Sequence, residues 1–527
     1  MNNRNYNIYF HTHTISGIIV AMVLYVIFFA GSFSFFKNEI SAWQQGESVD
    51  KHGSAGFPYA MVLDSLDRQY DLHGRELYLY LYPNSLNTYV YMGPSLDTLH
   101  NKQAGESTYF YYNLADKQGR SYSEAYDLGE FLYRLHFLAQ LNYVPIPIGY
   151  PFGYVVAGLV SFLFLFALIT GLLLHWDKII ANFYLFRPWA KLKTLWTDLH
   201  TVLGVIGFPY QFVYAVTGII LIVNTVYLAP IGELLYGGEE DKVYEDLGFE
   251  VATDAVFLDK PISEIPDIPY LVKQTEQRWG ESPLKRVTVK HYGDEGMQVI
   301  LQSDADTRRS FSGSGYVVYD ARGEIVKEKS PLAGSSYMDV MKSLVYRLHY
   351  GDYGGLFLKI VYFTLGIMGC VVIASGMVIW LVARDKNSVP AHKRRFNYWL
   401  VNIFLGICLS MFPVTGFTFI VVKTSQAVNE TFIYQTCFYS WLALSLYFIA
   451  RRDISRTNRE ALLLGAVMAL LVPVSNGLYS ANWPWQTLAA GELDIFFLDL
   501  FWVAVAIIAF ISYWKVKLHQ LRAARSH

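Results

Sequence analysis

Long apolar stretches alternate with two long polar segments along this chain of 527 residues. A helix needs roughly 20 apolar residues to cross the hydrocarbon core of a membrane. Eight stretches reach this length, at about residues 14–36, 150–175, 201–228, 356–383, 398–422, 432–450, 460–479 and 494–514. The pattern therefore predicts a polytopic α-helical membrane protein with about eight transmembrane helices.

The two polar segments, about 37–135 and 229–348, are each long enough to fold as a small domain. Residues 77–92 alternate Tyr and Leu with the period of a strand, and residues 268–280 have a helical pattern. Three strand-like runs follow that helix, at 287–291, 298–301 and 316–319. We expect each segment to form a small α+β domain in which a helix precedes antiparallel strands.

These stretches divide the chain into six parts. We assign 1–36 to the first transmembrane helix, 37–135 to the first polar domain, 136–228 to the second and third helices, 229–348 to the second polar domain, 349–386 to the fourth helix and 387–527 to a C-terminal module of four helices. The first helix follows a head with Arg4 as its single cation, and no small-residue cleavage site follows it, so we expect a retained anchor.

Lysine and arginine in the short loops predict the orientation. The loops after the second, fourth and sixth stretches carry several cations each, whereas the 423–431 loop has only Lys423 and the 480–493 loop has none. Cytoplasmic loops of membrane proteins carry an excess of Lys and Arg. Both termini are therefore predicted to lie in the cytoplasm, with both polar domains on the other side of the membrane.

Short motifs recur in the first four stretches. His13 and His200 each open a His-Thr-x-x-Gly motif, and the sequence Tyr-Arg-Leu-His at 133–136 returns at 346–349. Gly171 and Gly376 each precede the Trp that ends the second and fourth stretches. We infer two copies of one unit, helix–domain–helix, arranged as parallel repeats about an axis along the membrane normal. The last four stretches show no such copy.

Four of the recurring residues are histidines at predicted helix ends. The topology places His13 and His200 near the cytoplasmic face and His136 and His349 near the outer face. A six-coordinate haem needs only two protein ligands and a large apolar slot. Zinc or di-iron centres need three or four ligands, and carboxylates or thiolates are nearly absent near these positions. The pattern predicts two haems between the helices, with the four histidines as ligands to the haem iron.

Three more residues are candidate cofactor contacts. Arg134 and Arg347 lie two residues before their histidines, where they either bind haem propionates or anchor the helices at the interface. His175 ends the second stretch without a repeat partner and is an alternative ligand in place of His13 or His200. A histidine at a membrane interface also serves as an amphipathic anchor or a structural cap, which is the competing interpretation for all of them.

Composition agrees with lipid as the main solvent. The chain is 53% hydrophobic, 17% aromatic and 16% charged, whereas soluble proteins carry about 25% charged residues. A net charge of −2 gives no reason to expect a nucleic-acid partner. The three cysteines lie in apolar runs and offer no disulfide framework. The other histidines, among them His73 and His100, lie in polar segments, and we expect them to be solvated.

The histidine motifs together resemble a known family. His13 with Gly17, the Leu-His at 135–136, the Asp-Leu-His at 198–200 and the Leu-His-Tyr-Gly at 348–351 are similar to the PepSY-associated transmembrane proteins of bacteria, over roughly residues 8–386. That family includes inner-membrane ferrisiderophore reductases, also called iron-regulated membrane proteins. The resemblance implies periplasmic PepSY-like domains, b-type haem in the four-helix bundle, and His13, His200, His136 and His349 as its ligands. It further implies reduction of a ferric siderophore or another ferric chelate in the periplasm, with release of Fe(II).

The electron donor and two other functions stay open. No dinucleotide motif is present, so electrons come from a cytoplasmic flavin or nicotinamide reductase or from membrane quinol. The last four stretches depart from the simplest form of the family and offer a place for a partner or a quinone. One alternative is a non-catalytic, membrane-anchored binding or regulatory protein that acts through its PepSY-like domains. A transporter is disfavoured because the stretches contain almost no ionisable residues.

Overall fold

The computed structural model describes residues 2–49, 57–82, 85–184, 187, 192–280, 282, 284–307 and 309–525. The chain forms two compact units. The first, here called the helical unit, comprises Met1–Gly46, Asp127–Val226 and His349–His527. The second, here called the sheet unit, comprises Glu47–Tyr126 and Tyr227–Leu348.

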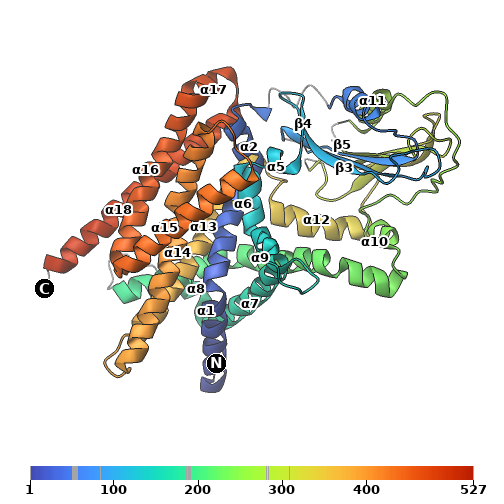
Figure 1. Ribbon diagram of the computed structural model, residues 1–527. Helices are drawn as coiled ribbons and strands as arrows, with labels where there is room; N and C mark the ends of the chain where they lie inside the picture. The colour runs from blue at the N-terminus through green and yellow to red at the C-terminus, as the bar shows by residue number, and fades with distance from the viewer. Residues whose placement is uncertain are drawn as a thin grey trace. The chain divides into compact units, whose positions relative to one another are not determined.

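Eight helices in the described part of the chain are long and apolar enough to cross a membrane, which confirms the prediction. They are α1 (Asn3–Ser34), α7 (Phe152–His175), α9 (Leu192–Tyr236), α13 (Gly355–Arg384), α14 (Ala391–Thr424), α15 (Glu430–Arg451), α16 (Ile454–Ser480) and α18 (Leu493–Arg525) (Figure 1). Within α9, the candidate membrane span is Thr194–Val223. The chain is therefore a polytopic membrane protein.

Helix α1 is the centre of packing for the first four of these helices. It contacts α7, α13 and the short helix α6 (Leu128–His136). Small residues allow this close approach, because a Cβ at Gly369 of α13 would lie 2.6 Å from the ring of Phe28. In the C-terminal module, α14 packs against both α15 and α16, and α16 packs against α18. The shorter helices are α2 (Lys37–Gln45), α4 (Tyr59–Asp67), α5 (Tyr122–Ala125), η2 (Ala139–Tyr143), η3 (Trp176–Lys178), α8 (Ile179–Phe183), α10 (Glu240–Asp246), α11 (Ile268–Trp279), α12 (Tyr337–Tyr350) and α17 (Pro484–Ala490).

The sheet unit contains one antiparallel sheet with the strand order β4-β3-β2-β1-β5-β6-β7-β8 (Figure 1). Its strands are β1 (Arg75–Tyr80), β2 (Asn87–Ser95), β3 (Thr108–Asn113), β4 (Gly119–Arg120), β5 (Leu284–Lys290), β6 (Gln298–Asp304), β7 (Ser314–Tyr319) and β8 (Ile325–Lys329). The helix predicted at 268–280 and the three strands after it are confirmed as α11 and β5 to β7. The alternating stretch at 77–92 covers parts of two strands, β1 and β2.

The two polar segments do not form separate sheets, which differs from our expectation of two small domains. Strand β1 of the first segment pairs with β5 of the second, with Leu77 opposite Val289 and Tyr80 opposite Arg286. This pairing satisfies backbone groups that would otherwise line two open sheet edges. Helices α4 and α11 contribute buried side chains, including Leu66 and Leu271, to a core that is shared with the strands. The segments therefore stabilise each other.

Candidate functional site

The first histidine pair consists of His13 on α1 and His200 on α9. Their ring centroids lie 6.1 Å apart, and the ring planes make an angle of 70°. Nδ1 of His13 lies 2.8 Å from the carbonyl oxygen of Ala167 on α7, and Nδ1 of His200 lies 2.9 Å from that of Val372 on α13. A carbonyl oxygen only accepts hydrogen bonds, so each neutral ring carries its proton on Nδ1. Nε2 is then the free, metal-binding nitrogen.

The second histidine pair consists of His136 on α6 and His349 on α12. Their ring centroids lie 5.8 Å apart at an angle of 43°. Nδ1 of His136 donates to the carbonyl oxygen of Ile27 on α1, at 2.9 Å. Nδ1 of His349 lies 2.8 Å from the hydroxyl of Thr217, and this hydroxyl itself donates to the carbonyl oxygen of Val213 at 2.6 Å. Thr217 therefore accepts from His349, and Nε2 is again the free nitrogen.

Helices α6 and α12 lie outside the eight apolar helices, and their histidines are shielded from water. Burial lowers the pKa of both His136 and His349. Both imidazoles are therefore neutral at neutral pH. Neutral imidazole is the form that binds a metal ion, because the ligating nitrogen must be free of its proton.

Glycines let the histidine rings lie directly on neighbouring helices. A Cβ at Gly31 of α1 would lie 2.7 Å from Cε1 of His136 and closer still to its Nδ1. A Cβ at Gly171 or Gly376 would lie 3.0 Å from Cε1 of His13 or His200, respectively. The recurring glycines near the ends of α7 and α13 therefore have a packing role: they leave room for an imidazole.

The two pairs contact α1 and α9 at well-separated levels. Gly31, which contacts His136, follows His13 by 18 residues along α1. Gly218, whose Cβ would lie 3.9 Å from Cε1 of His349, follows His200 by the same interval along α9. Eighteen residues of helix span about 27 Å. This is close to the roughly 30 Å thickness of the hydrocarbon core.

The ring separations can be compared with what a shared metal ion requires. An imidazole nitrogen lies about 2 Å from the ion that it binds and just over 1 Å from its own ring centre, so two imidazoles on opposite sides of one ion have centroids roughly 6 Å apart. The observed separations are 6.1 Å and 5.8 Å. Both observed separations are close to this value.

The two arginines have protein partners. Nε of Arg134 donates to Glu130 at 2.6 Å, and the same carboxylate pairs with Lys37 at 2.5 Å. Arg347 is buried in the sheet unit, where it donates to the carbonyl oxygen of Ala305 at 3.0 Å. The predicted contacts of Arg134 and Arg347 with haem propionates stay a prediction.

His175, the last residue of α7, lies near the first pair. It interacts electrostatically with both His13 and His200. The ring centroids of His13 and His200 lie 6.1 Å apart. The assignment of these two as the ligand pair, and the alternative in which His175 replaces one of them, both stay predictions.

A buried polar cluster in the C-terminal module corrects one expectation from the sequence. Asp499 of α18 is fully buried and accepts hydrogen bonds from Nε1 of Trp43 at 2.8 Å and from Nδ2 of Asn476 at 2.9 Å. Lys423 of α14 is also buried and donates to the carbonyl oxygen of Trp43 at 2.5 Å. The membrane helices thus do contain buried ionisable groups. In the sequence, Asp499 lies within the apolar stretch 494–514 and Lys423 directly follows the stretch 398–422. Ionisable residues in or beside a membrane span are functional candidates.

The structure is that of a polytopic membrane protein with two pairs of neighbouring histidines, His13 with His200 and His136 with His349. The model of the PepSY-associated TM region matches residues 10–383, and the chain belongs to this family, as its histidine motifs predicted. The chain is also similar to a Pseudomonas aeruginosa protein described as "Uncharacterized protein PA4219", with 24% identity over 282 residues. That match covers 50% of this chain and 66% of the relative.

Proposed function

We propose that the chain is a haem-containing reductase of the bacterial inner membrane. It passes electrons from the cytoplasm or the quinol pool to a periplasmic ferric siderophore, or another ferric chelate, and releases Fe(II). The proposal is carried by the two histidine pairs, whose ring centroids lie 6.1 Å and 5.8 Å apart. In all four histidines, Nδ1 makes a hydrogen bond to an atom of a neighbouring helix.

A duplicated helix–domain–helix unit supports this proposal. Ala167 and Gly171 contact His13, and their counterparts Val372 and Gly376 contact His200 at the same spacing. In the sheet, β1 and β5 pair antiparallel at the centre, and each is followed outwards by three more strands. Two PepSY-like domains related by a two-fold axis would give this strand order. In each histidine pair, one ligand then comes from each copy.

The loop charges support the orientation. The connection from α13 to α14 carries Arg384, Lys386 and Lys393, which favours the cytoplasm. The histidine pair that includes His13 then lies near the cytoplasmic face, and the sheet unit lies in the periplasm. An electron relay across the bilayer needs redox centres near both faces, and the two levels on α1 meet this need.

Haem would supply reversible one-electron chemistry of iron. The chain's own residues would hold and orient it: Nε2 of each histidine would bind the iron, and the hydrogen bond at Nδ1 fixes the tautomer and the ring direction. The chelate is the substrate. One electron converts its Fe(III) to Fe(II), which hard oxygen ligands bind more weakly, so reduction and release are coupled.

A spectroscopic experiment on the full-length protein tests the proposal. We expect the protein from haem-replete cells to show a reducible b-type spectrum with two haems per chain. His13→Ala, His200→Ala, His136→Ala and His349→Ala should each remove one haem. His392→Ala, at an exposed position in neither pair, is the control and should keep both. His175→Ala separates the two ligand assignments for the first pair.

Activity is measured with the same variants. Membranes are reduced either by quinol or by NADH with cytosol, and Fe(II) released from a ferric siderophore is trapped with a colorimetric chelator under anaerobic conditions. We expect His136→Ala and His349→Ala to abolish Fe(II) release. A colourless wild-type protein, or full function in these two variants, would instead favour the non-catalytic binding or regulatory protein.

A further inference from the structure

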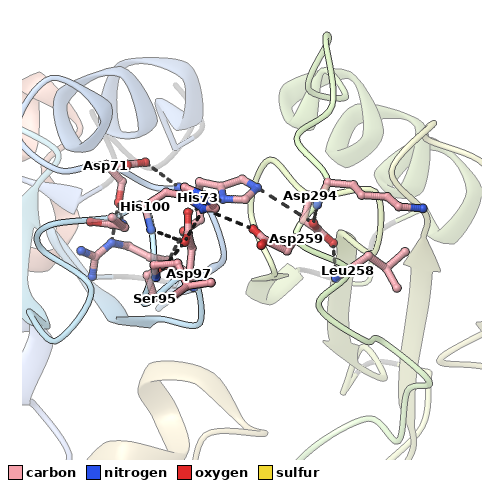
Figure 2. Close-up of polar contacts among 12 residues, drawn as sticks. Asp71, His73, Ser95, Asp97, His100, Leu258, Asp259 and Asp294 are labelled. Carbon is pink, nitrogen blue, oxygen red and sulfur yellow. Dashed lines mark hydrogen bonds and ion pairs between the residues drawn. The ribbon is translucent and has the colours of Figure 1, made fainter.

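A second group of imidazole and carboxylate side chains lies in the sheet unit. One possible ligand atom each from His73, Asp97 and Asp259 lie within 4.8 Å of one another. His73 precedes β1, Asp97 follows β2, and Asp259 lies in the segment before α11. Figure 2 shows these side chains converging from two different parts of the unit. The expectation that His73 is solvated is wrong, because only 16% of its side chain is exposed.

One ring nitrogen of His73, at the centre of this group, makes no hydrogen bond within the described part of the chain. Nδ1 of this ring lies 3.3 Å from Oδ2 of Asp97. Its Nε2 is buried, has no hydrogen-bond partner in the described part of the chain, and faces Asp294 at 3.9 Å. His100 adds a second imidazole, with Nδ1 3.1 Å from Asp97 and 3.8 Å from Asp259 (Figure 2).

Three carboxylates, those of Asp97, Asp259 and Asp294, lie in or beside this group. No lysine or arginine of the described residues forms an ion pair with any of the three. Oδ1 of Asp97 accepts hydrogen bonds from the backbone N–H of Leu99 at 3.2 Å and of His100 at 2.8 Å. Buried carboxylates normally have a cation or a metal ion as partner. A bound cation would supply it here.

The surrounding backbone holds the ligands in place. Asp294 accepts hydrogen bonds from the backbone N–H of Leu258 at 2.9 Å and of Lys260 at 2.7 Å, which fixes the loop on both sides of Asp259. Across the group, the hydroxyl oxygen of Ser95 accepts from the backbone N–H of Asp97 at 3.0 Å, and its proton goes to the carbonyl oxygen of His73. Such supporting contacts are typical of metal sites whose ligands are oriented in advance.

We propose that His73, Asp97 and Asp259 bind a divalent first-row transition metal ion, with His100 as a further ligand. Imidazole together with carboxylate suits ions such as Fe(II), Mn(II), Co(II) and Zn(II), whereas Ca²⁺ and Mg²⁺ prefer oxygen ligands alone. Ligand atoms bound to one ion at about 2.1 Å lie at most about 4.2 Å apart. The ligand atoms of the group lie within 4.8 Å of one another, so binding one ion requires them to approach by about 0.6 Å. Asp259 is the most exposed of the three side chains, at 41%.

This site goes beyond the proposed reductase activity and does not rest on it. Fe(II), the product of the proposed reaction, belongs to the class of ions that the site suits. The two proposals have different readouts: metal content for this site, and the haem spectrum for the reductase.

The test uses the full-length protein in detergent, stripped with a chelator and dialysed to equilibrium against micromolar Co(II). Bound cobalt is counted by elemental mass spectrometry, which haem does not disturb. We expect about one Co(II) per chain, and Asp259→Asn should weaken binding at least about tenfold. This variant keeps the fold, because Asp259 is exposed and has φ +56°, a left-handed conformation that Asn also tolerates. His100→Ala, at a position that is 71% exposed, should weaken binding as well.

Asp304→Asn is the matched control, because Asp304 is 42% exposed, lies in the same sheet and pairs with Lys285 outside the group. It should bind Co(II) as the wild type does. Zn(II) should displace the cobalt, and millimolar Ca²⁺ should not. Absence of bound Co(II) in the wild type, or equal binding by Asp259→Asn, overturns the site. Displacement by Ca²⁺ overturns its assignment to a transition metal.

Discussion

Replacing Gly31 by alanine places a methyl group where the ring of His136 lies. The new Cβ would lie 2.7 Å from Cε1 of His136. Carbon atoms in ordinary contact are about 3.5–4.0 Å apart, so the ring has to retreat by about 1 Å. Metal–ligand distances vary by only about 0.2 Å. The displacement therefore removes His136 as a ligand while His349 stays in place.

The same substitution leaves the fold largely intact. Alanine in a helix interior is favoured over glycine by about 1 kcal/mol. Overpacking in a tight interior costs about 1–3 kcal/mol. The net cost is therefore about 0–2 kcal/mol, which is too small to prevent α1 from forming, so a loss of haem would point to the displaced ring.

Gly218→Ala is the matched control on α9. Gly218 has the same place relative to His200 as Gly31 has relative to His13. A Cβ at Gly218, however, would meet Oγ of Ser161 at 3.5 Å and Cε1 of His349 at 3.9 Å, which are ordinary contacts. We therefore expect this variant to keep both haems.

Haem per chain is measured as the pyridine haemochrome, with a redox titration of the reduced-minus-oxidised spectrum and circular dichroism as a check of helix content. Gly31→Ala should lose one of the two haems, or show one of the two midpoint potentials shifted. Unchanged haem content and unchanged potentials in Gly31→Ala would refute the reasoning. His136 would then not be a ligand to a haem iron. Equal losses in both variants would refute the role of contact distance.

Three further changes test other contacts. Thr217→Val removes the acceptor of Nδ1 of His349 at 2.8 Å and leaves a buried N–H unpaired at a cost of about 1–3 kcal/mol; we expect haem loss or a shifted midpoint potential, and no change in either would contradict the assignment. Arg75 is fully buried and donates to the carbonyl oxygens of Asp71 and Gly93. Because lysine lacks the planar donor geometry, Arg75→Lys should lower the free energy of unfolding, measured by chemical denaturation, by roughly 2 kcal/mol or more. Equal stability of the variant and the wild type would show that these hydrogen bonds are dispensable. Burial opposes ionisation of Asp339, but hydrogen bonds from Lys329 and Ser314 hold its pKa well below the usual value, so this contribution to stability is present above about pH 4 and is lost as the pH falls further. The midpoint temperature of thermal unfolding should therefore fall less steeply between pH 5 and pH 3 in Asp339→Asn than in the wild type. An equal slope would show that ionised Asp339 does not contribute to stability.

The elements were predictable because their signals are local. Crossing a membrane requires apolar length, and all eight apolar helices contain the predicted stretches or most of them. The strand-like pattern likewise indicated where β5 to β7 lie. It did not reveal that Leu77 would lie opposite Val289. Alternation specifies which face of a strand is buried, but not which distant strand satisfies its open edge.

The histidine pairs were found through repetition rather than through their surroundings. The groups that orient His13, His200 and His136 are backbone carbonyl oxygens, which every residue type has, so no sequence motif marks them. Only Thr217, which accepts from His349, offers a side-chain signal. The group around His73 could not be found in this way. Asp97 and Asp259 lie far from His73 in the sequence, and no motif or spacing connects the three residues.

Under the proposed duplication, each functional feature requires both copies. His13 is oriented by α7 of its own copy but faces His200 of the other, and the second pair follows the same rule. The sheet is likewise complete only when β1 pairs with β5. A single copy would leave each histidine without its opposite ligand and each sheet with an open central edge. Losing the partner copy would therefore remove both proposed haem sites and expose the central edge of the sheet together.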